Sequence, residues 1–169
     1  MSFPAGSSGG PDGFSPQHLK DLVCCKEAGS DLVTALTGFV NMCLSGRCPQ
    51  EVSKIFFGGR LISLTKKSGG IRPIAIGFTL RRLVSKVANH HGITNLSRYF
   101  FPRQLGVGTS GGCEAAVHAS RRYLENMPQD KIMVKLDFSN AFNSLRRLDM
   151  IQAVKNRLRD LYLYVYSAY

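Results

Sequence analysis

The sequence predicts an α+β fold that is rich in helices and contains one β-hairpin. Three observations predict this class. Apolar residues recur at helical spacing between residues 15 and 46, two short β-type runs flank a glycine-containing turn between residues 60 and 76, and residues 131–138 alternate at the strand period. The 169 residues are enough for one domain with its own core.

The chain begins with a segment that is rich in Gly, Ser and Pro at residues 1–13. This composition predicts a flexible lead-in. Ser15 and Pro16 then predict an N-cap and the first residue of a helix, because proline has no N–H to lose at that position. Gly29 is the expected end of this helical region.

A second helix is predicted from Ser30, as its N-cap, to Gly46, as its stop. Its apolar positions recur three and four residues apart, which is the spacing of one helix face. They are Leu32, Leu36, Phe39, Val40, Cys43 and Leu44.

The pattern then changes to two β-type runs, residues 60–65 (RLISLT) and 71–76 (IRPIAI). The intervening KKSGG supplies the glycines that a hairpin turn needs. Pro73 cannot donate a ladder hydrogen bond, so its strand is expected at an edge or with a bulge. We therefore expect a hairpin that projects from the body of the protein.

A helix is predicted from Thr79, as its cap, to about Tyr99, and a second one from the glycine-rich loop at 106–112 to Pro128. The loop spells a literal G-x-G-x-x-G. A dinucleotide site would need a strand immediately before it, and residues 101–104 (FPRQ) make a poor strand. We interpret these glycines as a plain loop and helix start.

The last third of the chain predicts a strand and then a long helix. Residues 131–138 (KIMVKLDF) place their even-numbered apolar residues on one face and Asp137 on the other. From Ser144 onward, apolar residues repeat at helical spacing up to Tyr169 without a stop signal. We expect an incomplete sheet and an exposed apolar helix face.

The charge favours a polyanionic partner, since 22 Lys and Arg residues against 11 Asp and Glu give a net charge of +11. A solubility bias is the alternative explanation. The five cysteines have no zinc-ligand spacing, and we expect reduced, mostly buried thiols in an intracellular protein, nuclear or cytoplasmic. The N-terminus lacks signal-peptide features, and no apolar run is long enough to cross a membrane.

Asp137 is the first candidate for chemistry. A carboxylate at the carboxyl end of a strand can coordinate Mg²⁺, and the metal can bridge to phosphates. The alternative is that Asp137 caps the next helix or hydrogen-bonds a turn. Position alone favours the capping role. The residues around Asp137, described next, favour the metal-binding role instead.

Three blocks of the chain resemble reverse transcriptases of the non-LTR retrotransposon type, in that family's order. They are GPDGFSPQHLKDL (10–22), LISLTKKSGGIRPIAIGFTLRRLVSKVA (61–88) and KLDFSNAFNSLRR (135–147). The resemblance implies a fingers region at residues 14–100 and a partial palm at 101–169, with an incomplete palm sheet. Its activity would be template-directed dNTP addition by two-metal phosphoryl transfer in a full-length parent.

The resemblance also implies site residues. Asp137 would be catalytic and a metal ligand, together with the carbonyl of Phe138. The residues implied to contact the incoming nucleotide are Lys66, Lys67, Arg72, Phe138, Asn140, Ala141 and Phe142. Solvated surface charges are the alternative for the two lysines. The basic residues implied to contact nucleic acid are Arg81, Arg82 and Lys86.

The implied cofactor is Mg²⁺, as two ions in the full-length parent and at most weakly bound here. The implied partners are an RNA template, a DNA primer, dNTP and the remainder of the polymerase domain. The family's second catalytic block contains adjacent aspartates, and no Asp-Asp occurs in these 169 residues. We therefore expect a fragment that is inactive alone. The alternative is a non-catalytic, basic nucleic-acid-binding remnant of a retroelement.

Overall fold

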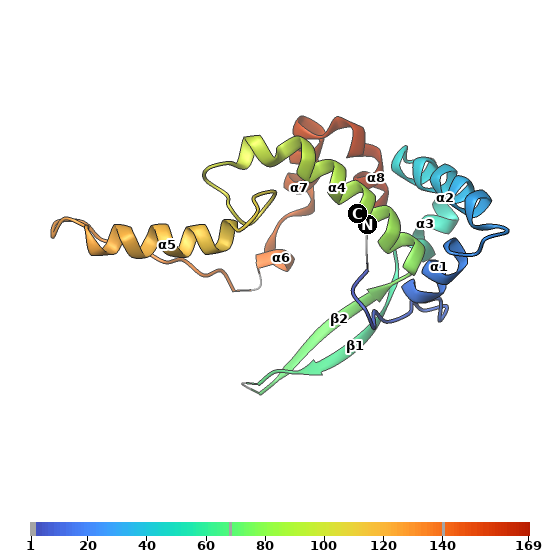
Figure 1. Ribbon diagram of the computed structural model, residues 1–169, viewed down its shortest axis with the longest axis horizontal. Coiled ribbons are helices and arrows are strands. Elements are labelled where there is room, and N and C mark those ends of the chain that lie inside the picture. The colour runs from blue at the N-terminus through green and yellow to red at the C-terminus, as the bar shows by residue number, and fades with distance from the viewer. Residues whose placement is uncertain (1–2, 68, 140) are drawn as a thin grey trace. The chain divides into compact units, whose positions relative to one another are not determined.

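The computed structural model describes residues 3–67, 69–139 and 141–169 (Figure 1). It has a helix-rich α+β fold, as predicted, and its one sheet among these residues is the two-stranded antiparallel hairpin β1–β2. The elements in order are α1 (Pro16–Val23), α2 (Gly29–Leu44), α3 (Gln50–Phe56), β1 (Gly59–Thr65), β2 (Ile71–Gly77), α4 (Thr79–Phe100), α5 (Gly112–Glu125), α6 (Ala141–Ser144), α7 (Arg147–Arg157), a 3-10 turn η1 (Arg159–Leu161) and α8 (Tyr162–Ala168).

The chain forms two compact units that do not follow its linear order. The first unit runs to Asn89 and also takes in Arg159–Tyr169, and the second unit is His90–Leu158. Helix α4 begins in the first unit and ends in the second. The C-terminal helix α8 therefore belongs with the N-terminal elements of the chain.

The predicted start of α1 is confirmed, while the predicted start of α2 is wrong. The Ser15 hydroxyl accepts a hydrogen bond from the His18 N–H, and the His18 ring accepts one from the Ser15 N–H, which together form a capping box. Helix α2 begins at Gly29 with Ala28 as its N-cap, so Ser30 lies inside the first turn. Helix α3 was not expected from the sequence, although Pro49 immediately precedes it.

Gly46 ends the α2 region as predicted, and it is also a point of close approach. Its φ of 71° lies in the left-handed region that favours glycine. A Cβ built there would lie 2.6 Å from the Leu163 Cβ of α8. Glycine therefore lets α8 pack against the end of α2, in agreement with the contact between these two helices.

All the buried hydrophobic side chains of the described residues belong to the first unit. They are Leu19, Val40, Cys43, Val84, Ala88, Leu161 and Tyr164. Tyr164 of α8 contacts the Phe57 ring, and its hydroxyl lies 2.8 Å from the Ser85 hydroxyl of α4. The core of this unit is thus completed by a helix from the far end of the chain.

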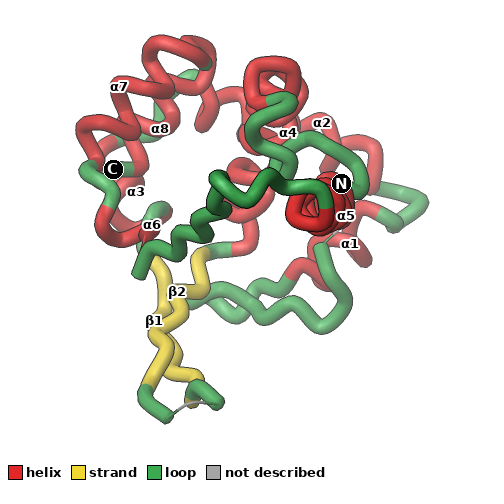
Figure 2. Tube along the Cα trace, turned by 90° about the vertical axis from the view of Figure 1, so that its left-hand side faces the viewer, coloured by secondary structure: helices red, strands yellow, loops and turns green. Residues whose placement is uncertain are grey.

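The hairpin forms as predicted. Strand β1 begins one residue earlier than predicted, at Gly59, and β2 ends one residue later, at Gly77. Pro73 pairs with Ser63 in the antiparallel register. A two-stranded ribbon has only edge strands, which is where proline is tolerated. Figures 1 and 2 both show the hairpin extending away from the helices of its own unit.

In the second unit, α5 is confirmed but the predicted strand at 131–138 is wrong. Residues 131–138 belong to no helix, strand or turn and are exposed. A strand needs a neighbour for its backbone hydrogen bonds, and the described residues supply none to this segment. Residues 131–138 therefore have the alternating pattern of a strand, but no second strand among the described residues pairs with them.

The single long helix predicted from Ser144 is also wrong, because the chain breaks there into α6, α7, η1 and α8. Leu158 adopts φ −140° and ψ 62°, which ends α7. The break lets Leu161 and Tyr164 enter the core of the first unit. At the end of α7, the Arg157 guanidinium lies 4.4 Å from the Tyr99 ring centroid, within the second unit.

The cysteines are all free thiols, as predicted, but most of them are not buried. Cys43 is buried, Cys48 is half-buried, and Cys24, Cys25 and Cys113 are exposed. Burial, followed by the neighbouring Cys48, raises the pKa of the Cys43 thiol. Among the described residues, every helix is too short or too polar to cross a lipid bilayer.

Candidate functional site

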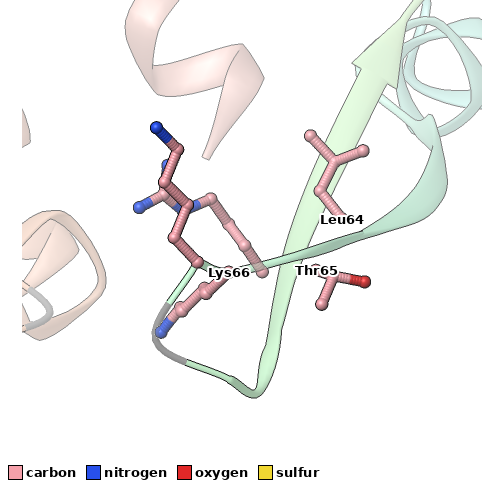
Figure 3. Close-up of a pocket in the computed structure, with 5 residues that line it drawn as sticks. Leu64, Thr65 and Lys66 are labelled. Carbon is pink, nitrogen blue, oxygen red and sulfur yellow. The ribbon is translucent and has the colours of Figure 1, made fainter.

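The end of the hairpin carries three basic side chains around an open hollow. Leu64, Thr65, Lys66, Lys67 and Arg72 line this hollow, which has a volume of about 440 Å³. Figure 3 shows Leu64 and Thr65 at the end of the strand and Lys66 extending from the start of the turn. All five lining residues are exposed to solvent. The hollow can therefore receive an anion without any rearrangement of a buried core.

The backbone of the turn holds the two lysines at the tip. The Lys66 N–H donates to the Gly70 carbonyl at 3.0 Å, and the Gly69 N–H donates to the Lys66 carbonyl at 3.1 Å. Gly69 and Gly70 have φ values of 82° and 83°, which side chains with a Cβ rarely adopt. The glycines of KKSGG therefore determine where the lysines lie.

The strand register places Arg72 beside the turn. Arg72 is directly opposite Leu64, so the two side chains share one face of the ribbon. Arg60 lies on that same face at the other end of the hairpin, opposite Ile76. No Asp or Glu occurs between residues 59 and 77, so nothing within the hairpin neutralises these cations.

Asp137 and Phe138 lie in the second unit, in the exposed segment without regular structure. The Asp137 carboxylate makes no ion pair with any other described residue. Phe138 is 74% exposed. No group of three or more metal-ligating side chains occurs among the described residues, so Asp137 is not part of a preformed metal site there.

The remaining residues implied to contact a nucleotide follow Asp137 along the chain. Ala141 is the first residue of α6 and is exposed. Phe142 belongs to α6, and its side chain is outside the described part of the structure. Asn140 also lies outside the described residues.

Arg81 holds the hairpin onto its unit. Its guanidinium donates to the Phe57 carbonyl and, at 3.1 Å, to the Gly58 carbonyl, and it lies 5.8 Å from the Phe57 ring centroid. These carbonyls follow the last turn of α3, where unpaired acceptors need a donor. The structure thus gives Arg81 a positioning role between α3 and β1.

Arg82 and Lys86 contact the N-terminal segment, which the composition predicts to be flexible. The Arg82 guanidinium donates to the Ser8 carbonyl at 2.7 Å. The Phe3 ring lies under both cations, 5.3 Å from the Arg82 guanidinium carbon and 5.0 Å from the Lys86 amine. Just beyond this segment, the Thr79 hydroxyl donates to the Phe14 carbonyl. Thr79 is the first residue of α4 and not its N-cap, so the predicted helix cap is wrong.

Of the residues that the resemblance implies to contact a nucleotide, the structure therefore brings three together within the first unit: Lys66, Lys67 and Arg72. The sequence did not reveal that Leu64 and Thr65 complete the hollow, although the strand alternation opposite Arg72 could have indicated Leu64. The contact of Phe3 with Arg82 and Lys86 could not be predicted from the sequence, because a single aromatic residue in a Gly- and Ser-rich segment forms no periodic pattern.

Comparison of the chain with protein-family models, with curated proteins and with solved structures found no match.

Proposed function

We propose that this chain contributes the nucleotide-contacting hairpin and the first catalytic block of an RNA-directed DNA polymerase of the non-LTR type. The observation that carries the proposal is the basic end of the hairpin. Lys66, Lys67 and Arg72 line an open hollow there, and the hairpin contains no acidic residue. The three sequence blocks described above support it by their order along the chain.

The chemistry of a nucleoside triphosphate fits this hollow. A triphosphate carries several negative charges, and transfer of its phosphoryl group needs fixed cations around them. Arg72 offers a planar fork that can pair with two phosphate oxygens, whereas each lysine offers a point charge. A hairpin that extends from its unit can present all three groups to one ligand.

The described residues do not fit a two-metal centre by themselves. Two-metal catalysis needs several carboxylates around both ions, and the exposed Asp137 carboxylate belongs to no group of three or more metal-ligating side chains among the described residues. In the proposal, Asp137 and the Phe138 carbonyl are ligands that need further carboxylates from the remainder of a polymerase domain. The chain alone is therefore expected to add no nucleotides.

The proposal also assigns phosphate contacts of a template or primer to basic residues of α4. Arg82 and Lys86 are the candidates, and their contacts with Phe3 and the Ser8 carbonyl would have to be exchanged for phosphate. Arg81 is the weakest candidate, because its guanidinium already serves two carbonyls. Phosphate contacts of this kind give binding that weakens steeply with salt.

A second function is favoured by the net charge of +11. In this alternative, the chain binds nucleic acid without sequence preference and has no nucleotide site, as a remnant of a retroelement would. The two functions differ in what the hairpin hollow recognises. The polymerase proposal requires preference for a triphosphate at Arg72, whereas the alternative requires only spread positive charge.

The test measures binding of a fluorescent deoxynucleoside triphosphate by anisotropy, in the presence of Mg²⁺. Arg72→Ala should weaken binding about tenfold, because it removes a charge-assisted contact with the phosphates. Arg60→Ala is the matched control, since it removes the same charge from the same face at the other end of the hairpin. It should change the affinity by less than about twofold.

Equal weakening by the two substitutions would show a general charge effect and would refute the site. Absence of triphosphate binding together with salt-sensitive RNA binding would favour the alternative function. A primer-extension assay completes the test: robust extension by this chain, abolished by Asp137→Asn, would contradict the expected inactivity.

A further inference from the structure

Among the described residues, 132–138 form a segment in which four large apolar side chains are strongly exposed. Ile132 is 83% exposed, Val134 66%, Leu136 73% and Phe138 74%. Among the described residues of the second unit, no large side chain is buried. A row of apolar side chains on a backbone without ladder hydrogen bonds is a template for pairing with another chain.

We propose that this segment pairs antiparallel with the same segment of a second copy of the protein, across a two-fold axis at Val134. This pairing does not rest on the proposed function, but both use the Asp137 carboxylate, so the paired segment and a metal-binding Asp137 are alternative states of the protein. Antiparallel pairing of identical strands generates an isologous interface in which each cross-strand contact occurs twice. The argument for a second copy is the charge complementarity of the segment with itself.

The register follows from which side chains lie opposite each other. Side chains directly opposite share one face, so apolar residues meet only if even-numbered residues pair with even-numbered ones. Centring on Val134 places Lys131 opposite Asp137 and Ile132 opposite Leu136. The Lys131 amine now lies 3.3 Å from the exposed Asp130 carboxylate, and the pairing exchanges this exposed ion pair for one with Asp137 of the second copy. Centring on Lys135 would instead place lysine opposite lysine, and centring on Met133 would place Lys131 opposite Lys135.

A centre at Leu136 is the remaining competitor, since it places Lys135 opposite Asp137. A seven-residue pairing in that register would extend to Ser139, which lies in a turn. The Val134 register is completed within residues 131–137, all of which lie outside helices and turns. The Val134 register is therefore favoured.

One backbone hydrogen bond also determines which residues form the ladder. The Lys131 N–H already donates to the Pro128 carbonyl at 3.0 Å, so the pair of Lys131 with Asp137 must be a non-hydrogen-bonded one. Such pairs alternate with hydrogen-bonded pairs and bring the side chains closer together. The ladder bonds then come from Ile132, Val134 and Leu136, while the charges meet at the close pairs.

The first test is the concentration dependence of sedimentation of the full chain, from low to high micromolar. We expect reversible dimers, with the weak affinity of a small interface. Lys131→Glu should weaken the dimer roughly tenfold, because both symmetric ion pairs become repulsive. The double variant Lys131→Glu with Asp137→Lys should restore association to within about twofold, because both pairs are re-formed with reversed signs.

The matched control is Lys135→Glu, which has the same charge change two residues from Asp137. In the proposed register, Lys135 faces Met133, so this variant should dimerise nearly as well as the unmodified protein. Val134→Lys should abolish association, because it places two lysines opposite each other at the axis. A monomer at all concentrations, or a dimer insensitive to Val134→Lys, would overturn the proposal. Loss caused by Lys135→Glu rather than Lys131→Glu would overturn the register.

Amide hydrogen exchange gives a second readout that does not depend on substitutions. In the dimer, the amides of Ile132, Val134 and Leu136 should be protected, while those of Met133 and Lys135 should remain fast. The protection should disappear on dilution. Uniform protection along the segment, or none at concentrations where the protein is dimeric, would contradict a strand pair at this position.

Discussion

Replacing Tyr164 by alanine tests whether the C-terminal helix completes the first unit. Tyr164 is 6% exposed, its ring contacts the Phe57 ring at 5.8 Å between centroids, and its hydroxyl meets the Ser85 hydroxyl at 2.8 Å. Truncation of a buried aromatic residue to alanine costs about 3–5 kcal/mol. A small domain has a total stability of about 5–15 kcal/mol, so the loss is a large share of it.

Tyr166→Ala is the matched control, because Tyr166 lies in the same helix but is 61% exposed. Both variants gain the same small increase in helix propensity, which cancels in the comparison. The main contact that Tyr166→Ala removes is the one between the Tyr166 and Tyr162 rings, so the expected loss in the free energy of unfolding is less than about 1 kcal/mol.

The measurement is urea unfolding followed by far-UV circular dichroism, since the chain contains no tryptophan. The difference between the variants should appear as a lower midpoint for Tyr164→Ala with a similar slope. If both substitutions cost the same free energy of unfolding, then α8 is not part of the core of the first unit, and the assignment of residues 159–169 to that unit would be refuted.

Two further predictions concern the same unit. Burial raises the pKa of Tyr164 above its ordinary value of about 10, so the folded state keeps the phenol proton while the unfolded chain loses it. The free energy of unfolding should therefore fall as the pH rises above about 10, and this part of the fall should be missing in Tyr164→Phe. Unfolding titrations of the two proteins check it, and a difference between them that is constant with pH would contradict it. Arg81→Ala should cost about 1.5–3 kcal/mol in urea unfolding, because the Phe57 and Gly58 carbonyls lose a charged donor. Arg60→Ala should cost less than about 0.5 kcal/mol, and equal losses would argue against the positioning role of Arg81.

The hairpin is the element whose structure followed most directly from the sequence. Its strands alternate locally, and its turn contains the glycines that the positive φ values of Gly69 and Gly70 require. The cluster of Lys66, Lys67 and Arg72 then follows, because the turn and the register place these residues at one end. The capping box at Ser15 could likewise be anticipated from neighbouring residues.

The roles of the basic residues in α4 could not be predicted in the same way. The sequence indicates that Arg81 and Arg82 lie on a helix, but not which groups they meet. Arg81 binds carbonyls more than twenty residues away, and Arg82 binds the Ser8 carbonyl near the N-terminus. Such partners depend on how distant segments pack, and hydrophobic periodicity does not contain that information.

The sequence by itself determined the elements whose signals are local: the capping box of α1, the turn chemistry of the hairpin and the apolar periodicity of α1 and α2. The tertiary structure decided what became of the two ambiguous segments. Residues 131–138 have the pattern of a strand but form no ladder, because a strand exists only with a hydrogen-bonding neighbour. The helical pattern after Ser144 is divided at Leu158, because Leu161 and Tyr164 gain more from burial in the core of the first unit than from continuing one helix.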